Sequence, residues 1–254
     1  MRHRVDARAR RALLLAGALA TLVVVVPPGR AQPAQGGGRV QGSGKVIDDE
    51  RSVPAFSRVV VNGPLDVRIA PADAHGVVVR ADDNIAPLVE TVVSGDDLVV
   101  GQRPGASYRT RTRVVVRVRA APALRGVVLR GSGDIRAVRI DGEVFEMTLQ
   151  GSGDIAIDDL QARTVAVSLA GNGDVRAKGT VDSLGVVIDG SGDVHFADLV
   201  ARTVAVSIRG SGDARVHATE ELQVSIAGSG DVRYRGEPKI TRTVRGAGEV
   251  RPLR

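Results

Sequence analysis

The chain has 254 residues, of which 43% are hydrophobic and 25% are charged, and it contains 31 glycines and no cysteine. This length is enough for one or two domains with a sizeable core. The absence of cysteine excludes a disulfide framework, a thiolate metal site, a cysteine nucleophile and a lipid-anchored N-terminal cysteine. With only five aromatic residues, the core must be built from Val, Ile, Leu and Ala.

The net charge of +6 is unevenly distributed along the chain. Residues 1–31 hold six arginines and one acid, whereas the remainder carries 29 basic and 28 acidic residues, a net charge of +1. A nearly neutral body lacks the electrostatic footprint of a nucleic-acid-binding protein. We therefore expect no nucleic-acid partner.

Residues 1–31 have the pattern of a signal peptide. An Arg-rich start precedes an apolar run over residues 12–26, and small residues before Ala31 suit cleavage after it. An uncleaved N-terminal anchor is the alternative interpretation, against which the apolar run is shorter than the roughly 20 residues of a membrane span. Residues 32–38 read as a flexible linker. The chain is predicted to be exported to the periplasm or the cell surface, by the general or the twin-arginine route, without a membrane span after cleavage.

A Gly-x-Gly-Asp tetrad recurs through the second half of the chain. Its first glycines are spaced by 20, 20, 19, 20, 18 and 18 residues, counting a final copy at Gly246 that carries Glu in place of Asp. Gly42 begins a further Gly-x-Gly motif that resembles an opening copy. The six complete tetrads lie at residues 131–134, 151–154, 171–174, 190–193, 210–213 and 228–231.

Each repeat alternates apolar and polar residues with a period of two, which is typical of β-strands. Before the tetrad at 171–174, for example, Val165, Val167 and Leu169 alternate with Thr164, Ala166 and Ser168. Two strands in each repeat of about 20 residues, with the same turn in every repeat, predict an all-β parallel solenoid with one coil per repeat. An antiparallel sandwich or meander is the alternative.

The domain of residues 39–254 is predicted to have two parts. Residues 122–254 form regular coils. Residues 39–121 contain strand patterns and turn signals such as Asn62-Gly63-Pro64 but no clean tetrads, so they form either divergent coils or a cap at the N-terminal end.

The chain resembles the bacterial head GIN domain family, described as the heads of auto-transporter adhesins. The resemblance rests on the run from Phe56 to Gly63, on residues 97–100 and 122–124, and on the serial Gly-Ser-Gly-Asp units. It implies a fold similar to right-handed β-helices and a role in surface adhesion. It supplies no catalytic or binding residues.

Stacking the coils would place the tetrad aspartates in one column. In the structural interpretation they cap neighbouring amides and pair with basic residues two positions later, such as Arg176 and Arg215. The alternative is a calcium-binding repeat, because carboxylates beside glycine turns supply the oxygens that Ca²⁺ prefers. The candidate calcium ligands are Asp134, Asp154, Asp174, Asp193, Asp213 and Asp231; no other cofactor is expected.

No catalytic residue is predicted. Glycoside hydrolysis needs two carboxyl groups in different environments, whereas the repeated aspartates are expected to have equivalent environments. The sequence also has no nucleophile elbow and no zinc-protease motif. A polysaccharide-acting β-helix enzyme is the remaining enzymatic alternative. We instead expect a non-enzymatic cell-envelope module that binds glycans or surface proteins on its long regular faces. Exposed terminal coils are compatible with oligomers.

Overall fold

The computed structural model describes residues 39–121 and 124–253, so the predicted signal peptide and linker lie outside the described residues. Almost every element in the described part is a strand, with one short 3₁₀ helix, η1 (Ala86–Leu88). None of its helices is long and apolar enough to cross a membrane.

The strands of the N-terminal half are β1 (Val40–Gln41), β2 (Val46–Arg51), β3 (Arg58–Asn62), β4 (Asp66–Pro71), β5 (Gly76–Asp82), β6 (Val89–Ser94), β7 (Asp97–Gln102), β8 (Tyr108–Arg109) and β9 (Val115–Ala120). The strands that follow are β10 (Gly126–Gly131), β11 (Ile135–Ala137), β12 (Ile140–Gly151), β13 (Ile155–Gly171), β14 (Val175–Gly190), β15 (Val194–Gly210), β16 (Ala214–Gly228), β17 (Val232–Arg235), β18 (Lys239–Gly246) and β19 (Val250–Pro252).

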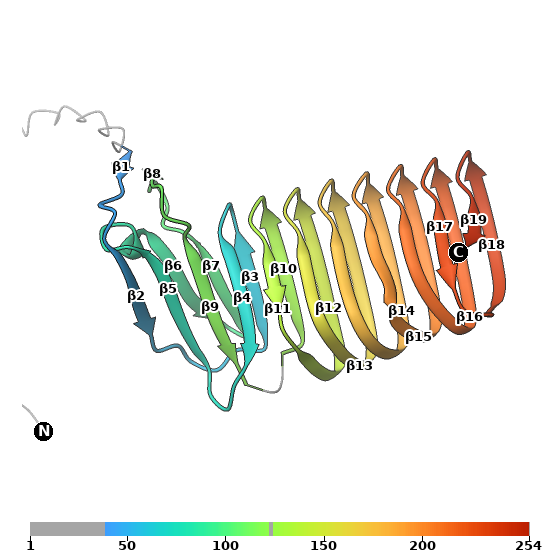
Figure 1. Ribbon diagram of the computed structural model, residues 1–254, viewed down its shortest axis with the longest axis horizontal. Coiled ribbons are helices and arrows are strands. Elements are labelled where there is room, and N and C mark those ends of the chain that lie inside the picture. The colour runs from blue at the N-terminus through green and yellow to red at the C-terminus, as the bar shows by residue number, and fades with distance from the viewer. Residues whose placement is uncertain (1–38, 122–123, 254) are drawn as a thin grey trace, which may run out of the picture. The chain divides into compact units, whose positions relative to one another are not determined.

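These strands form a parallel β-solenoid of about 6 turns, which confirms the predicted fold (Figure 1). The segments before each Gly-x-Gly-Asp turn pair in parallel from β3 through β10, β12, β13, β14, β15 and β16 to β18, and we call this the pre-turn sheet. The segments after each turn pair in the same way from β4 through β11 to β19, as the post-turn sheet. The antiparallel alternative is wrong for the repeats.

The turn glycines stay in register although the repeats differ in length. Gly131, Gly151 and Gly171 are partners in successive coils, and the match continues to Gly246. Register shifts occur instead in the bend at the far side of the coil, for example between Ile157 and Leu160. A missing residue is therefore absorbed in the bend, and the turn column is left intact.

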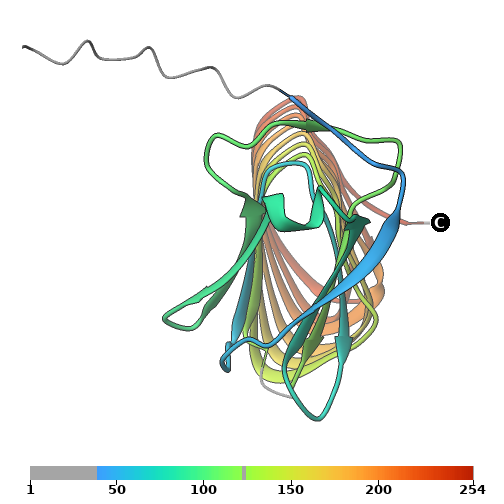
Figure 2. The ribbon, with the colours of Figure 1, turned by 90° about the vertical axis from the view of Figure 1, so that its left-hand side faces the viewer.

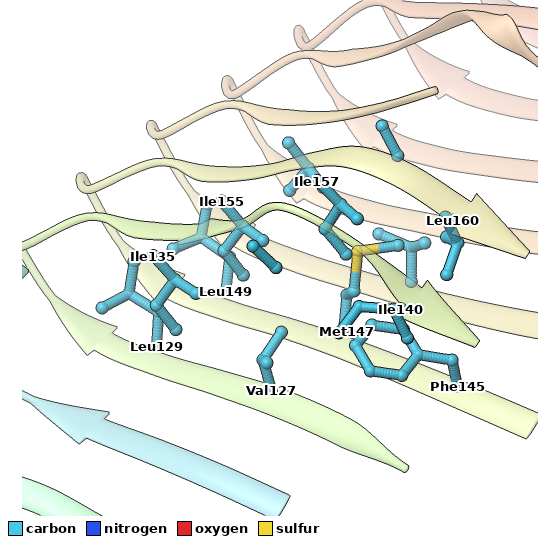
Figure 3. Packing of buried hydrophobic residues seen from close by; sticks show 14 of the residues in the cluster. Val127, Leu129, Ile135, Ile140, Phe145, Met147, Leu149, Ile155, Ile157 and Leu160 are labelled. Atoms are coloured by element: carbon cyan, nitrogen blue, oxygen red, sulfur yellow. The ribbon is translucent and has the colours of Figure 1, made fainter. Parts of the chain in front are cut away.

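The core runs along the solenoid between the two sheets (Figure 3). Leu129 and Leu149 follow one another in successive coils, as do Ile135 and Ile155 (Figure 3). Phe145, at an inward position of β12, is completely buried. The predicted alternation of inward apolar and outward polar residues is confirmed.

The N-terminal part combines a divergent coil with a cap. Strands β3 and β4 pair in parallel with the next coil, whereas β5 pairs in antiparallel fashion with β2 and with β9. Figure 2, which looks onto this end, shows η1 in front of the stacked coils. Ile85, Ala86 and Val89 are buried there, so apolar side chains close this end of the core.

The Gly42 motif is not the opening copy of the repeat. Gly42 instead donates its N–H to the Arg109 carbonyl in the cap, and the first turn of the column is formed by residues 62–66. The resemblance of Gly42–Lys45 to a tetrad was misleading because no post-turn strand of the solenoid follows it.

Asp82 fastens the cap and is 1% exposed. Its carboxylate accepts hydrogen bonds from the hydroxyls of Thr110 and Thr112, each at 2.6 Å. These two bonds hold the pKa of Asp82 below its ordinary value.

Acid should therefore remove the contribution of Asp82 to stability. Because its folded pKa is depressed, this contribution is complete above the unfolded pKa of about 3.9 and is lost as the pH falls from there through the folded pKa. We expect Asp82→Asn to lower the urea midpoint at pH 6, and the gap to wild type to shrink between pH 4 and 2. A gap that is constant or widens with acid would contradict this assignment.

Candidate functional site

The Gly-x-Gly-Asp turns stack into one continuous turn column. The carbonyl of each first glycine accepts N–H groups from the next turn, as Gly131 O does from Ser152 at 3.0 Å and Gly153 at 3.2 Å. The first glycines have φ between 135° and 148°, a region that only glycine adopts without strain.

The second glycine of each turn is needed for a different reason. None of these residues has a positive φ, so backbone conformation does not explain why glycine is needed there. A Cβ on Gly173 would instead lie 1.9 Å from the Gly153 carbonyl oxygen of the preceding coil. The closeness of two stacked backbones therefore excludes a side chain.

The six tetrad aspartates and Asp66 form a hydrogen-bonded aspartate column, defined here as Asp66, Asp134, Asp154, Asp174, Asp193, Asp213 and Asp231. The Oδ1 atom of each accepts the backbone N–H of the acid in the next coil, at distances from 2.8 to 3.3 Å. Glu249 donates the last of these N–H groups, to Asp231. The expected capping by Asp exists, but it joins neighbouring coils and does not close the turn of its own coil.

Asp66 is a member of this column that the sequence pattern did not reveal. It follows Gly63-Pro64-Leu65, so the second glycine is missing, yet its Oδ1 accepts the Asp134 N–H at 3.3 Å. The signal that could have found it is Gly-x-x-Asp followed by the alternating Val67 and Ile69.

Arginines relieve part of the repulsion along the column, as expected. Arg176 pairs with Asp174 at 2.6 Å in its own coil and with Asp154 at 3.5 Å in the preceding coil. Arg251 likewise reaches Asp231 at 3.4 Å. Arg136 and Arg215, by contrast, form no ion pair within the described residues.

Removing one carboxylate from the column should cost a backbone hydrogen bond. We expect Asp193→Ala to lower the free energy of unfolding by about 1 to 2 kcal/mol, because the Asp213 N–H loses its acceptor. Asp193→Asn keeps an Oδ1 acceptor and should lose less than half as much. Urea unfolding of the three proteins checks this, and equal losses for Ala and Asn would contradict it.

Asp174, Asp193 and His195 come close enough together to be considered as metal ligands. Arg215 Nη1 lies 3.2 Å from His195 Nδ1, and since arginine can only donate, Nδ1 accepts and the ring proton lies on Nε2. That Nε2 lies 3.5 Å from Asp174, which also binds Arg176. Asp174 therefore lies between the imidazole of His195 and the guanidinium of Arg176. Calcium binding by the six tetrad aspartates stays a prediction.

The pre-turn sheet carries a shallow trough of about 550 Å³ on its outer surface. Its floor is formed by the small residues Ala166, Gly185 and Ala205, which are partners in three successive coils. A row of mainly hydroxyl-bearing residues lies two positions after the floor residues in the strands. It consists of Thr148, Ser168, Val187, Ser207 and Ser225. A second hydroxyl row on the other side of the floor consists of Thr164, Ser183 and Thr203.

A model of a protein family matches residues 55–238, and it is the family described as "Putative auto-transporter adhesin, head GIN domain". The chain belongs to this family. The resemblance predicted from the sequence is thereby confirmed. No protein among the curated ones matches the chain.

Solved structures share the fold of this head GIN domain. A putative adhesin from Bacteroides fragilis is 23% identical, with a TM-score of 0.79 over 84% of this chain and 100% of its own. A putative lipid binding protein from Parabacteroides distasonis is 25% identical, with a TM-score of 0.71 over 85% and 100%. A putative adhesin from Parabacteroides merdae is 20% identical, with a TM-score of 0.67 over 85% and 99%.

The histidines of the head GIN domain do not converge on a reaction centre in the described part. His75 packs against the Phe56 ring at a centroid distance of 4.3 Å, in the cap. His195 lies beside Asp174 of the aspartate column, and His217 lies in β16. The family description is consistent with an adhesion-like module.

Proposed function

We propose that this protein is an exported, non-enzymatic adhesion module whose trough binds an extended glycan of the cell envelope. The observation that carries the proposal is the alignment of the floor residues across neighbouring strands. Because Ala166, Gly185 and Ala205 are direct partners, the floor runs across the strands, parallel to the solenoid axis. A chain-like ligand can therefore follow the floor from coil to coil.

The chemistry of the trough suits a polyhydroxylated chain. The floor presents methyl groups and bare backbone, against which the C–H faces of sugar rings can pack. The rows of Ser and Thr on either side provide hydroxyls that both donate and accept hydrogen bonds. Successive coils repeat these groups about 4.8 Å apart, so a polymer meets the same set several times. Weak contacts then add up along its length.

Family and leader support the cellular setting of this proposal. The family description names an adhesin head, and the N-terminal 31 residues have the pattern of a signal peptide. A rigid solenoid that presents one long face to the outside is an economical way to hold a polymer at the envelope.

Filling the floor should abolish binding without harming the fold. A Cβ on Gly185 would meet only the Val165 carbonyl oxygen, at 3.9 Å, which is ordinary contact. We expect Gly185→Leu to reduce co-sedimentation with insoluble peptidoglycan at least tenfold. The control Thr180→Leu changes an exposed residue of the same strand that does not line the trough, and it should bind like wild type.

The same experiment separates a second candidate ligand. The apolar floor would also accommodate an acyl chain, and one structural neighbour is described as a putative lipid binding protein. Binding of a fluorescent fatty acid that Gly185→Leu prevents, together with no binding to any glycan, would favour the lipid and overturn the glycan proposal. Equal binding of peptidoglycan by wild type and Gly185→Leu would show that the trough is not the binding site.

A further inference from the structure

Within the described residues the two ends of the solenoid differ, because the N-terminal end is capped and β18 at the C-terminal end has one unpaired edge. At the N-terminal end the cap buries apolar residues such as Ile85 and Val89. At the C-terminal end β18 pairs with β16 on one side, and the described residues place no strand on its other side. The N–H and C=O groups along that edge are free to pair with an incoming strand.

The last coil leaves part of the core uncovered. Ile240 and Val244 are 37% and 38% exposed, whereas their partners one coil earlier, Leu222 and Ile226, are each 1% exposed. The same inward positions are thus buried wherever another strand follows. One added strand on β18 would bury both side chains.

Between these two residues an arginine occupies a core position. Arg242 is the partner of Val224, and the equivalent inward positions of all earlier coils hold Val or Met. Its Nη1 donates to the Val250 carbonyl at 3.4 Å, so the side chain reaches across the open end toward β19. The remaining guanidinium donors suit a carboxylate, which they can bind in bidentate fashion.

The charge of β18 narrows the choice of partner. Lys239, Arg242 and Arg245 give this strand three positive charges, and none of them forms an ion pair within the described residues. A second copy of the chain, docking end to end through β18, would place three cations against three, and like charges on paired strands are destabilising. An acidic strand would instead attract these three cations, so the charge of β18 favours an acidic partner over a second copy of the chain.

We propose that the C-terminal end of the solenoid accepts an extended acidic segment of a partner protein, which adds to β18 as a further strand. The inward side chains of this segment have the order apolar, acidic, apolar, and they cover Ile240, Arg242 and Val244. Its outward acids lie opposite Lys239 and Arg245. This surface is separate from the trough and does not depend on what the trough binds.

A capped synthetic peptide tests the proposal. The sequence Glu-Leu-Thr-Glu-Thr-Val-Glu-Gly places an acid opposite each cation of β18 in either strand direction, and a control peptide has Lys in place of each Glu. Fluorescence anisotropy with the purified protein should show binding of the acidic peptide only. This binding should weaken at high salt, since screening reduces the attraction between the charges.

Protein variants localise the site. The triple change Lys239→Glu, Arg242→Glu and Arg245→Glu should weaken the acidic peptide at least about tenfold and create binding of the Lys peptide. Lys178→Glu, at an exposed lysine of β14, is the matched control and should leave binding unchanged.

Backbone methylation distinguishes strand addition from simple charge attraction. Alternate amides of an added strand face β18, so N-methylation of one alternating set should abolish binding and methylation of the other set should not. The proposal would be overturned by binding that survives both methylation patterns, by equal binding of both peptides, or by self-association of the wild-type protein that the triple change removes. Attachment to anionic lipid vesicles in place of peptide binding would overturn it too.

Discussion

Gly171→Ala is expected to be among the most damaging single changes in the protein. The residue has φ of 141°, and a Cβ there would lie 2.1 Å from the Gly151 carbonyl oxygen. Backbone strain alone costs about 1–3 kcal/mol, and the clash forces two stacked coils apart in addition. We expect a loss of more than about 3 kcal/mol in the free energy of unfolding, or failure to fold.

Gly185→Ala is the matched control for that substitution. Gly185 lies in the next coil, its φ is not positive, and a Cβ there has ordinary contacts. Because glycine weakens strand interiors by about 0.5–1 kcal/mol relative to alanine, this variant should be neutral or slightly more stable. Urea unfolding followed by circular dichroism compares the two. Similar midpoints for both variants would show that the turn column is not as closely stacked as described.

Phe145→Ala is expected to have the second large effect. Phe145 is completely buried in β12, and its removal leaves a cavity between the two sheets (Figure 3). Replacing a buried phenylalanine by alanine costs about 3–5 kcal/mol. In a domain of this size, that loss lowers the melting temperature by about 10 °C, since each kcal/mol corresponds to about 2–4 °C.

Val144, the residue before Phe145, provides the control. Val144 points outward from the same strand and is 49% exposed, so Val144→Ala should shift the free energy of unfolding by less than about 0.5 kcal/mol. Thermal unfolding of both variants, which compares their melting temperatures with that of the wild type, tests this prediction. A larger shift for Val144→Ala than for Phe145→Ala would mean that the inward and outward faces of β12 are reversed.

The repetition in the sequence was sufficient to predict the regular coils. The spacing of the tetrads by 18 to 20 residues predicts one coil per repeat, and the alternation around Val165 and Val167 predicts which side chains face inward. These signals are strong because each coil contacts only its neighbours, so the same local rule applies again in every repeat.

Features that depend on departures from the repeat could not be predicted in this way. The cap is stabilised by contacts between segments distant in sequence, such as Asp82 with Thr110 and Thr112. No repeat spacing in the sequence predicts these contacts. Asp66 was missed because its turn has lost the second glycine. The true role of that glycine, close approach of two backbones, became visible only once the coils were stacked.

The candidate binding surface was only partly predictable. Alternation correctly separated Thr164 and Ser168, which are exposed, from the buried Val165 and Val167. The trough itself arises because Ala166, Gly185 and Ala205 are partners, and this requires the exact register between coils of unequal length. The register shift that absorbs the missing residue lies in the bend, where the sequence carries no marker for it.

The most direct test of the proposed function is a methyl NMR titration of the protein with a soluble peptidoglycan oligosaccharide. Ala and Val methyl groups label both faces of the pre-turn sheet. If the glycan lies in the trough, the signals of Ala166, Val187 and Ala205 shift in a saturable manner, while those of the inward Val186 and Val206 shift much less. Shifts confined to residues outside the trough, or no shifts at millimolar oligosaccharide, would contradict the account.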